Sequence, residues 1–247
     1  MQHYGRNWQF ALTVALLVFA TSGCNERQSE GTPTSTDGLA VEDPEASHGA
    51  SIPFSAAQVF IEYNASAQDA GIQVFLDAEA WRRVAIFDER GRDLLEIEAS
   101  GGMKQLGLTE LRFEGAEPDP SEVFDAFPAG IYKFRGATIE RQRLTATAIL
   151  SHDLPAAPEF SPSQGETVDP DDVEIEWDPI AGVARYQVIV ESDANGFVLE
   201  VSVSSSTTTL RIPSTFLVPN TEYKAEVLAI APSGNRTITE GTFVTGP

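Results

Sequence analysis

Apolar and polar residues alternate along most of the chain from Phe54 onward, and no segment carries an apolar stripe with the spacing of a long helix. Alternation of this kind places every second side chain on one face of a β-strand. In the first half of this region it predicts strands at 59–63, 71–76, 83–87, 93–98, 110–114, 130–135 and 144–150. The turn at residues 89–92 predicts that the third and fourth of these strands form a hairpin.

A short helix is predicted between the strands, over residues 119–127. Pro120 and the acidic residues around it are typical of a helix start, and Pro128 ends the helix. Seven short strands in about 100 residues are typical of an antiparallel β-sandwich. The run from Phe127 to Phe134, with its Pro-x-Gly-x-Tyr turn, resembles the late hairpin of bacterial immunoglobulin-like domains. We therefore expect an immunoglobulin-like sandwich over residues 52–153.

The second half carries a more specific pattern, which follows a proline-rich hinge at residues 154–158. The segment 173–179, with Trp177, resembles the second strand of a fibronectin type III domain, and 184–191 resembles the third. Residues 217–223 reproduce the L-x-P-x-T-x-Y signature of that family, and strands at 224–231 and 241–245 follow. The resemblance implies a fibronectin type III-like sandwich over residues 154–247. It also implies that Trp177 and Tyr223 share one core, with the Tyr223 hydroxyl bonded to upstream backbone as a tyrosine corner.

The N-terminal residues 1–23 have the features of a secretory signal peptide. Arg6 supplies a positive charge, the apolar run 10–20 is too short to span a bilayer, and small residues follow. Gly23-Cys24 then resembles a bacterial lipobox, although Thr21 stands where that family prefers Leu. The resemblance implies that Cys24 is acylated and that the peptide before it is cleaved off. Asn25, the residue after the cysteine, resembles the one found there in lipoproteins that are sorted to an outer membrane. The alternative is an ordinary secretory signal, cleaved nearby, with an incidental cysteine.

Residues 24–51 are polar, acidic and almost free of large apolar side chains. Such a segment buries too little surface to offset the entropy of ordering, so we expect a disordered linker between the lipid anchor and the folded body. The sequence thus predicts an all-β protein with two tandem antiparallel sandwiches behind a signal peptide and a linker.

The charge and the residue inventory exclude several function classes. Asp and Glu number 37 against 16 Lys and Arg, a formal net charge of −21, which disfavours binding to nucleic acid. The single cysteine excludes an intrachain disulfide and a thiolate metal cluster. Of the three histidines, His48 falls in the linker, and His152 stands between Ser151 and Asp153, where neighbouring side chains cannot form a catalytic triad alone.

Two groups of acidic residues could bind calcium, which prefers oxygen ligands in loops. One comprises Asp169, Asp171 and Asp172, and the other comprises Asp69, Asp77 and Glu79. Neither matches an EF-hand, and acidic turns are common without an ion. We expect no resident cofactor or metal, and calcium at the first group is the alternative.

Two functions remain open. The first is a non-enzymatic, lipid-anchored binding or scaffold protein of the bacterial envelope, which presents sandwich surfaces to a protein partner or an envelope polysaccharide. The second is an accessory carbohydrate-binding or hydrolytic lipoprotein, in which Trp81 stacks on sugar or a carboxylate such as Glu79 acts as catalyst. The second function requires a concave pocket with aromatic residues and convergent carboxylates, whereas the first predicts filled sandwiches. A buried Trp81 that plugs the sandwich end would favour the first.

Overall fold

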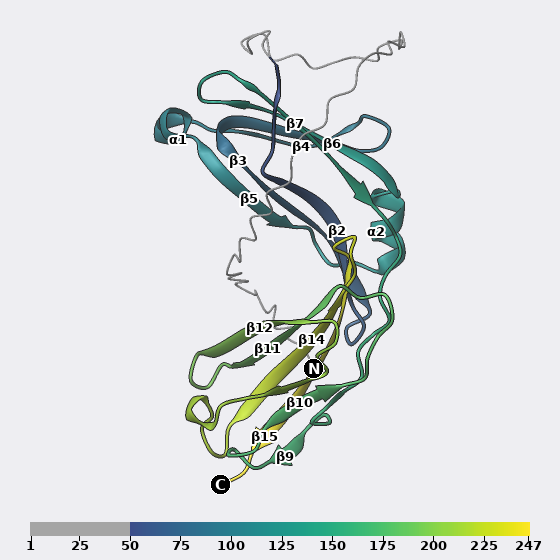
Figure 1. The fold of residues 1–247 in the computed structure, drawn as a ribbon, viewed down its shortest axis with the longest axis vertical. Coiled ribbons are helices and arrows are strands. Elements are labelled where there is room, and N and C mark those ends of the chain that lie inside the picture. The colour runs from purple at the N-terminus through teal and green to yellow at the C-terminus, as the bar shows by residue number, and fades with distance from the viewer. Residues whose placement is uncertain (1–49) are drawn as a thin grey trace, which may run out of the picture. The chain divides into compact units, whose positions relative to one another are not determined.

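Two β-sandwiches account for residues 50–247, which are the part of the chain that the computed structural model describes (Figure 1). The predicted all-β fold is confirmed. The predictions made for residues 1–49, which include the signal peptide, Cys24 and most of the linker, concern residues outside this part. Within residues 50–247 no helix is both long enough and apolar enough to cross a membrane.

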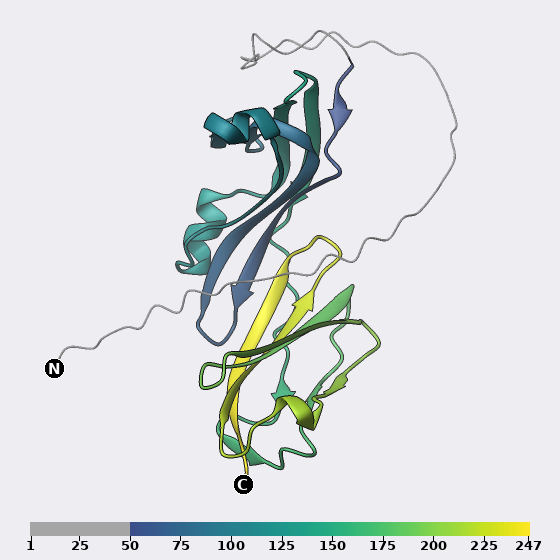
Figure 2. The same ribbon diagram turned by 90° about the vertical axis from the view of Figure 1, so that its left-hand side faces the viewer.

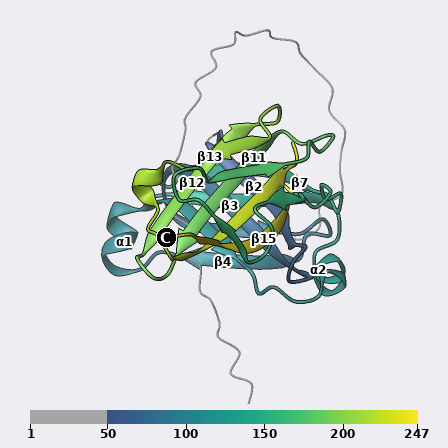
Figure 3. The ribbon, with the colours of Figure 1, turned by 90° about the horizontal axis from the view of Figure 1, so that it is seen from below.

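The first sandwich contains seven strands and two short helices. The strands are β1 (Ile52–Pro53), β2 (Ala56–Asn64), β3 (Asp69–Phe87), β4 (Asp93–Glu98), β5 (Leu108–Glu114), β6 (Gly130–Thr138) and β7 (Arg143–Leu150). The helices are α1 (Gly101–Leu106) and α2 (Pro120–Ala126), which lie far apart in Figure 3 and on the same side of this sandwich in Figure 2. Helix α2 starts as predicted, because the Asp119 side chain accepts a hydrogen bond from the Ser121 amide and Pro120 occupies the first turn.

Strand β3 runs through both layers of this sandwich. Its first part pairs with β2 and β5, and its second part pairs with β4 and β6. The prediction of two separate strands at 71–76 and 83–87 is therefore wrong. The intervening residues contain no Gly or Pro, so the chain passes through register shifts near Asp77 and Trp81 instead of a turn. The bulged region lets one strand cross from one layer to the other.

The core of the first sandwich is filled by the inward residues of both layers. Trp81, Tyr132 and Phe134 are fully buried in it. Close packing at the bulge requires glycine at position 107, where φ is 80° and a Cβ would lie 2.7 Å from that of Ala80. The sandwich is thus closed around its own side chains at the place where β3 bends.

The second sandwich has a three-stranded layer facing a layer of four strands to which the short strand β9 is added (Figure 2). The first layer has the order β13 (Thr209–Arg211), β10 (Glu174–Trp177), β8 (Phe160–Ser161). The second has the order β12 (Phe197–Ser204), β11 (Arg185–Ser192), β14 (Glu222–Ile230), β15 (Arg236–Thr245). Strand β9 (Glu166–Val168) runs parallel to β15, and a single 3-10 turn, η1 (Ser214–Phe216), precedes β14.

The core of the second sandwich contains Trp177, Tyr186 and Tyr223, as the resemblance implied. The Trp177 and Tyr186 rings meet edge to face with centroids 5.3 Å apart. The Tyr223 hydroxyl accepts a hydrogen bond from the Val218 amide at 2.8 Å. The predicted tyrosine corner is therefore confirmed, and the second sandwich has a fibronectin type III-like fold.

One sheet continues through both sandwiches. Residues 236–238 of β15 pair in parallel with residues 62–64 of β2, so the order β1-β7-β6-β3-β2-β15-β14-β11-β12 forms one path. Within each sandwich the main pairings are antiparallel, as expected from the sequence. The parallel pairing between the two sandwiches was not expected, and it creates a joint where side chains of both meet.

Candidate functional site

The acidic residues proposed for calcium lie in the exposed loop between β9 and β10. The Asp169 carboxylate accepts a hydrogen bond from the Asp171 amide at 2.9 Å, which is the pattern of an Asx turn. Asp172 forms an ion pair with Arg211 at 2.6 Å. Within residues 50–247 these three carboxylates do not form a group with metal-binding spacing. The contacts that the structure does show are those of solvent-facing turn residues.

The second predicted acidic group does not form. Asp69 and Asp77 both lie on β3, where pairing with β2 keeps the backbone extended between them. Eight residues of extended strand span about 27 Å. Glu79 is exposed in the bulged part of the same strand. The prediction of a cluster fails because the loop that would bring these acids together is a strand.

Trp81 cannot stack on a sugar, because its side chain is 0% exposed in the core of the first sandwich. The interpretation of Trp81 as an exposed aromatic is wrong, and the alternative, a core residue, is confirmed. His152 is half-buried: its ring stacks on Phe124 at 4.7 Å, and Nε2 lies 2.8 Å from the Phe127 carbonyl oxygen. The Ser151 hydroxyl donates to Asp153 at 2.9 Å, so these three neighbours form no triad.

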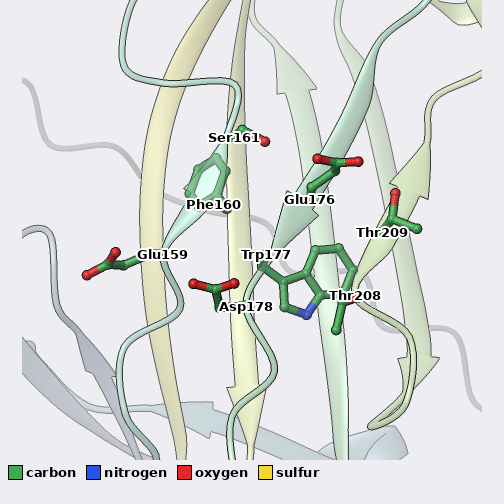
Figure 4. Close-up of a pocket in the computed structure, with 8 residues that line it drawn as sticks. All are labelled: Glu159, Phe160, Ser161, Glu176, Trp177, Asp178, Thr208 and Thr209. Carbon is green, nitrogen blue, oxygen red and sulfur yellow. The ribbon is translucent and has the colours of Figure 1, made fainter.

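A shallow, open pocket lies over the three-stranded layer of the second sandwich (Figure 4). Its lining comprises Glu159, Phe160, Ser161, Glu176, Trp177, Asp178, Thr208 and Thr209. The Trp177 ring packs on Tyr186 inside the core, so its face is not available for stacking. Its indole Nε1 is nevertheless buried without a hydrogen-bond partner, within the part of the chain described. The pocket thus offers three carboxylates and several hydroxyl groups to a polar ligand, whereas the buried indole N–H is not accessible from it.

The joint between the sandwiches is held by the side chain of Asn235, which is 1% exposed. Its Oδ1 accepts a hydrogen bond from the Ile61 amide at 2.9 Å. Its Nδ2 donates to the carbonyl oxygens of Ser151 at 2.8 Å and Asp153 at 2.9 Å. One side chain from the β14–β15 turn therefore connects strand β2 with the segment between the sandwiches.

Thr237 and Glu240 add further bonds across the same joint. The Thr237 hydroxyl donates to the Pro155 carbonyl at 2.7 Å, which fastens the proline-rich segment that the sequence predicted to be a hinge. The Glu240 amide donates to the Ser66 hydroxyl at 3.0 Å, and Asn64 donates to the Glu240 carboxylate at 3.2 Å. These hydrogen bonds add to the β2–β15 backbone pairing, so the joint is held by side-chain as well as backbone hydrogen bonds.

A buried ion pair completes the joint. The Arg236 guanidinium lies 4.3 Å from the centroid of the Phe60 ring, and its Nη1 lies 3.6 Å from Glu62 Oε2. Burial, opposed by the charge of Arg236, raises the pKa of Glu62 to about 7. Glu114 and Glu117 raise it further through their own negative charges. Glu62 therefore exchanges a proton near neutral pH.

Three carboxylates at the joint have the spacing of a metal site. Oxygen atoms of Glu62, Glu114 and Glu117 lie within 4.8 Å of one another, and a hard cation such as Ca²⁺ takes oxygen ligands of this kind. Burial and the charge of Glu114 raise the pKa of Glu117. Arg236 supplies a competing positive charge to Glu62. Protons and Arg236 thus already balance part of the negative charge of this group.

The residues of the joint carry no pattern in the sequence that identifies them as a site. Glu62 interrupts the apolar residues around it, and the turn Ser233-Gly234-Asn235 is a typical hairpin signal. Neither feature indicates that two segments separated by 174 positions come together. The pocket carboxylate of Glu176 alternates with Ile175 and Trp177 along β10, so it lies on the outer face of the strand, where it is exposed.

Comparisons with known proteins find similarity among solved structures. No family model matches the chain, and no curated protein matches it. A segment of two fibronectin type III domains from chicken tenascin is 14% identical, with a TM-score of 0.30, over 76% of this chain and 97% of that one. The FN1–FN3 domains of chicken CNTN1 are 13% identical, with a TM-score of 0.33, over 80% of this chain and 65% of that one. A computer-redesigned β-sandwich protein is 20% identical, with a TM-score of 0.31, over 39% of this chain and 97% of that one.

Proposed function

We propose that this chain is a lipid-anchored, non-enzymatic binding or scaffold protein of a bacterial envelope, attached through an acylated Cys24. Asn25 after the cysteine favours the outer membrane where the organism has one. Its partner is a protein that contacts the surfaces of the sandwiches, and its linker holds these surfaces away from the bilayer.

The observation that carries the proposal is the fastened joint between two filled sandwiches. Both cores are closed around their own aromatic side chains, among them Trp81, Trp177 and Tyr223. Asn235 and the β2–β15 pairing connect the two sandwiches through backbone bonds. A scaffold benefits from such a connection, because surfaces on two domains held together lose less freedom when a partner binds both.

Anchoring is tested by metabolic labelling with a fatty acid, followed by membrane fractionation. The wild-type chain is expected to carry the label and to enter the membrane fraction, whereas Cys24→Ser is expected to lose both. Labelled Cys24→Ser in the membrane fraction would contradict the anchor. A second variant, Thr21→Leu, restores the preferred lipobox residue and is expected to remain labelled.

The partner is sought by crosslinking and pull-down from detergent-solubilised membranes. Surface variants then show whether a substituted residue binds the partner or only supports the fold. A variant that keeps its melting temperature but loses the partner identifies a residue of the contact. Recovery of the same partner with every surface variant would show that the sandwiches do not carry the binding.

A second candidate function is a carbohydrate-binding or hydrolytic activity, and the Trp177 pocket is the observation that favours it. Glu159, Glu176 and Asp178 meet the requirement for several carboxylates around one depression. Panels of glycoside, ester and peptide substrates test it, with Glu176→Gln as the variant. Turnover that is lost in Glu176→Gln, but kept in Glu79→Gln outside the pocket, would show that the chain is an enzyme and would overturn the scaffold proposal.

A further inference from the structure

Strands β6 and β7 carry a row of exposed side chains on the outer face of the first sandwich. Ile131 pairs with Ile149, Lys133 with Thr147, Arg135 with Thr145 and Ala137 with Arg143 in this antiparallel pair. We refer to these exposed residues as the β6–β7 face: Ile131, Lys133, Arg135, Arg143, Thr145, Thr147 and Ile149. The alternate residues of both strands, such as Phe134 and Leu144, fill the core. The face is therefore a regular sheet surface held in place by its buried side.

The face is positively charged in a strongly acidic protein. The segment 130–150 contains four basic residues, Lys133, Arg135, Arg141 and Arg143, and one acidic residue, Glu140, whereas the chain has a net charge of −21. Within residues 50–247 no carboxylate lies at ion-pair distance from any of these four basic groups. Arg135 contacts the Phe87 ring with its guanidinium, at 5.2 Å from the ring centroid. The charges of this face are thus left for an external partner.

Two large apolar residues lie on the same face. Ile131 is 53% exposed, and its cross-strand partner Ile149 is 70% exposed. Both lie at outward-facing positions of their strands, as Lys133 and Thr147 do. Their side chains are therefore not part of the core of the sandwich. Two isoleucines beside a row of cations combine apolar and electrostatic contact on one surface.

We propose that the β6–β7 face binds the surface of an anionic phospholipid bilayer. Lys133, Arg135 and Arg143 contact lipid phosphates, and the Ile131–Ile149 pair enters the boundary between headgroups and acyl chains. The proposal goes beyond the anchor at Cys24, because it concerns a second attachment by the folded body. Together the two would orient the first sandwich on the bilayer.

The apolar pair favours a lipid surface over a soluble polyanion. A polyanionic glycan has charge but no apolar layer, whereas a bilayer presents acyl chains directly beneath its charged groups. The acidity of the rest of the protein does not prevent this contact, because charges more than about 8 Å away are largely screened at physiological ionic strength. Glu96 and Glu98 of β4 lie on the same side of this layer, because they pair with Ala85 and Arg83 of β3, which in turn pair with β6. Two strand spacings, about 10 Å, separate them from the cations of β6, and Glu96 already forms an ion pair with Arg83.

The proposal is tested with the mature chain carrying Cys24→Ser, so that the outcome does not depend on acylation. Flotation with vesicles measures its partition onto bilayers of phosphatidylcholine, with and without about one third phosphatidylglycerol. Binding is expected only with the anionic lipid, and is expected to fall steeply with salt. Since each basic group near an anionic surface contributes about fivefold, Lys133→Glu with Arg143→Glu is expected to lower the partition by about 25-fold or more.

Matched variants separate this face from a general charge effect. Lys104→Glu with Arg211→Glu changes the net charge equally, at two exposed residues on other elements, and is expected to change the partition less than about twofold. Ile131→Ser with Ile149→Ser is expected to weaken binding at every salt concentration while the melting temperature is kept. Equal losses in both charge variants, an unchanged partition without the isoleucines, or binding to heparin but not to vesicles would each overturn the proposal. If lipid labelling showed that Cys24 is not acylated, only the anchor would be contradicted. The proposal for the β6–β7 face would not be affected, because its test uses Cys24→Ser.

Discussion

Asn235 shows how much of the joint between the sandwiches depends on one side chain. Its amide satisfies three backbone groups, the Ile61 N–H and the carbonyls of Ser151 and Asp153. A buried polar group that loses its partner costs about 1–3 kcal/mol. The joint therefore depends more on Asn235 than on any single apolar contact within it.

Asn235→Ala is expected to destabilise the protein by about 2–4 kcal/mol, because several buried backbone groups lose their partners together. Urea unfolding of the full chain measures the loss. Asn235→Asp keeps the acceptor for the Ile61 amide and removes both donors, so its loss should be comparable in size. A variant with alanine and wild-type stability would show that water replaces the amide and that the joint is loosely packed.

Trp177 tests the core of the second sandwich at the same scale. The ring is 5% exposed and packs on Tyr186. Trp177→Ala is expected to cost about 3–5 kcal/mol through lost burial and an unfilled cavity. Trp177→Phe keeps most of the apolar contact and is expected to cost clearly less. Chemical denaturation checks both variants, and near-native stability of the alanine variant would contradict the placement of this ring in the core.

At the scale of elements, strands with regular alternation could be predicted from the sequence and the others could not. The segment 132–135 alternates between apolar and basic residues and lies in β6, and 217–223 forms the tyrosine corner that its signature implies. Strand β3 was divided in the prediction because residues 77–80, Asp-Ala-Glu-Ala, contain no large apolar side chain that marks a core-facing position. Strands β12 and β13 were not predicted, since the serines and threonines at 202–209 weaken the pattern.

The pairing of β2 with β15 lies beyond what local pattern can predict. Antiparallel neighbours are joined by short turns, which the sequence shows, whereas this parallel contact joins segments 174 positions apart. The side chains that meet there, Glu62 and Arg236, appear in the sequence as ordinary surface charges. The candidate site at the joint therefore followed only from the structure. Glu62 lies in a predicted strand, whereas Asn235, Arg236 and Thr237 fall between the predicted strands at 224–231 and 241–245.

The β2–β15 joint is expected to be pH-dependent. Burial raises the pKa of Glu62 from 4.5 to about 7, and burial also raises the pKa of Glu117 and of Glu226. A raised pKa means that the folded state favours the protonated form. The stabilisation is therefore complete below about pH 4.5 and is lost as the pH rises through about 7.

Thermal melting between pH 5 and pH 8.5, at about 0.15 M salt, measures this dependence. The melting temperature is expected to fall across this range in the wild-type chain and to vary less in Glu62→Gln, which mimics the protonated side chain. Glu96→Gln, at an exposed residue paired with Arg83, is the control and should keep the wild-type slope. Equal slopes in the wild type and Glu62→Gln would show that Glu62 does not titrate in this range.

At the scale of the whole molecule, the linker is expected to be independent of the folded body. Residues 25–51 are acidic and carry few large apolar side chains, so little burial is available to them. Removal of these residues is expected to leave the melting temperature unchanged within about 2 °C. Limited proteolysis should cut the same segment first. A larger drop in melting temperature would show that the segment packs on a sandwich and is part of its stability.

The two sandwiches are expected to unfold together, because their contact is made of backbone bonds and buried polar groups. Separation would leave the Arg236 guanidinium and the partners of Asn235 without their present contacts, a cost that both sandwiches share. Scanning calorimetry of the full chain should show one transition whose calorimetric and van't Hoff enthalpies agree. Asn235→Ala should resolve it into two, since the cores centred on Trp81 and Trp177 remain intact. Two transitions in the wild-type chain would mean that the joint couples the sandwiches too weakly to present their surfaces as one body.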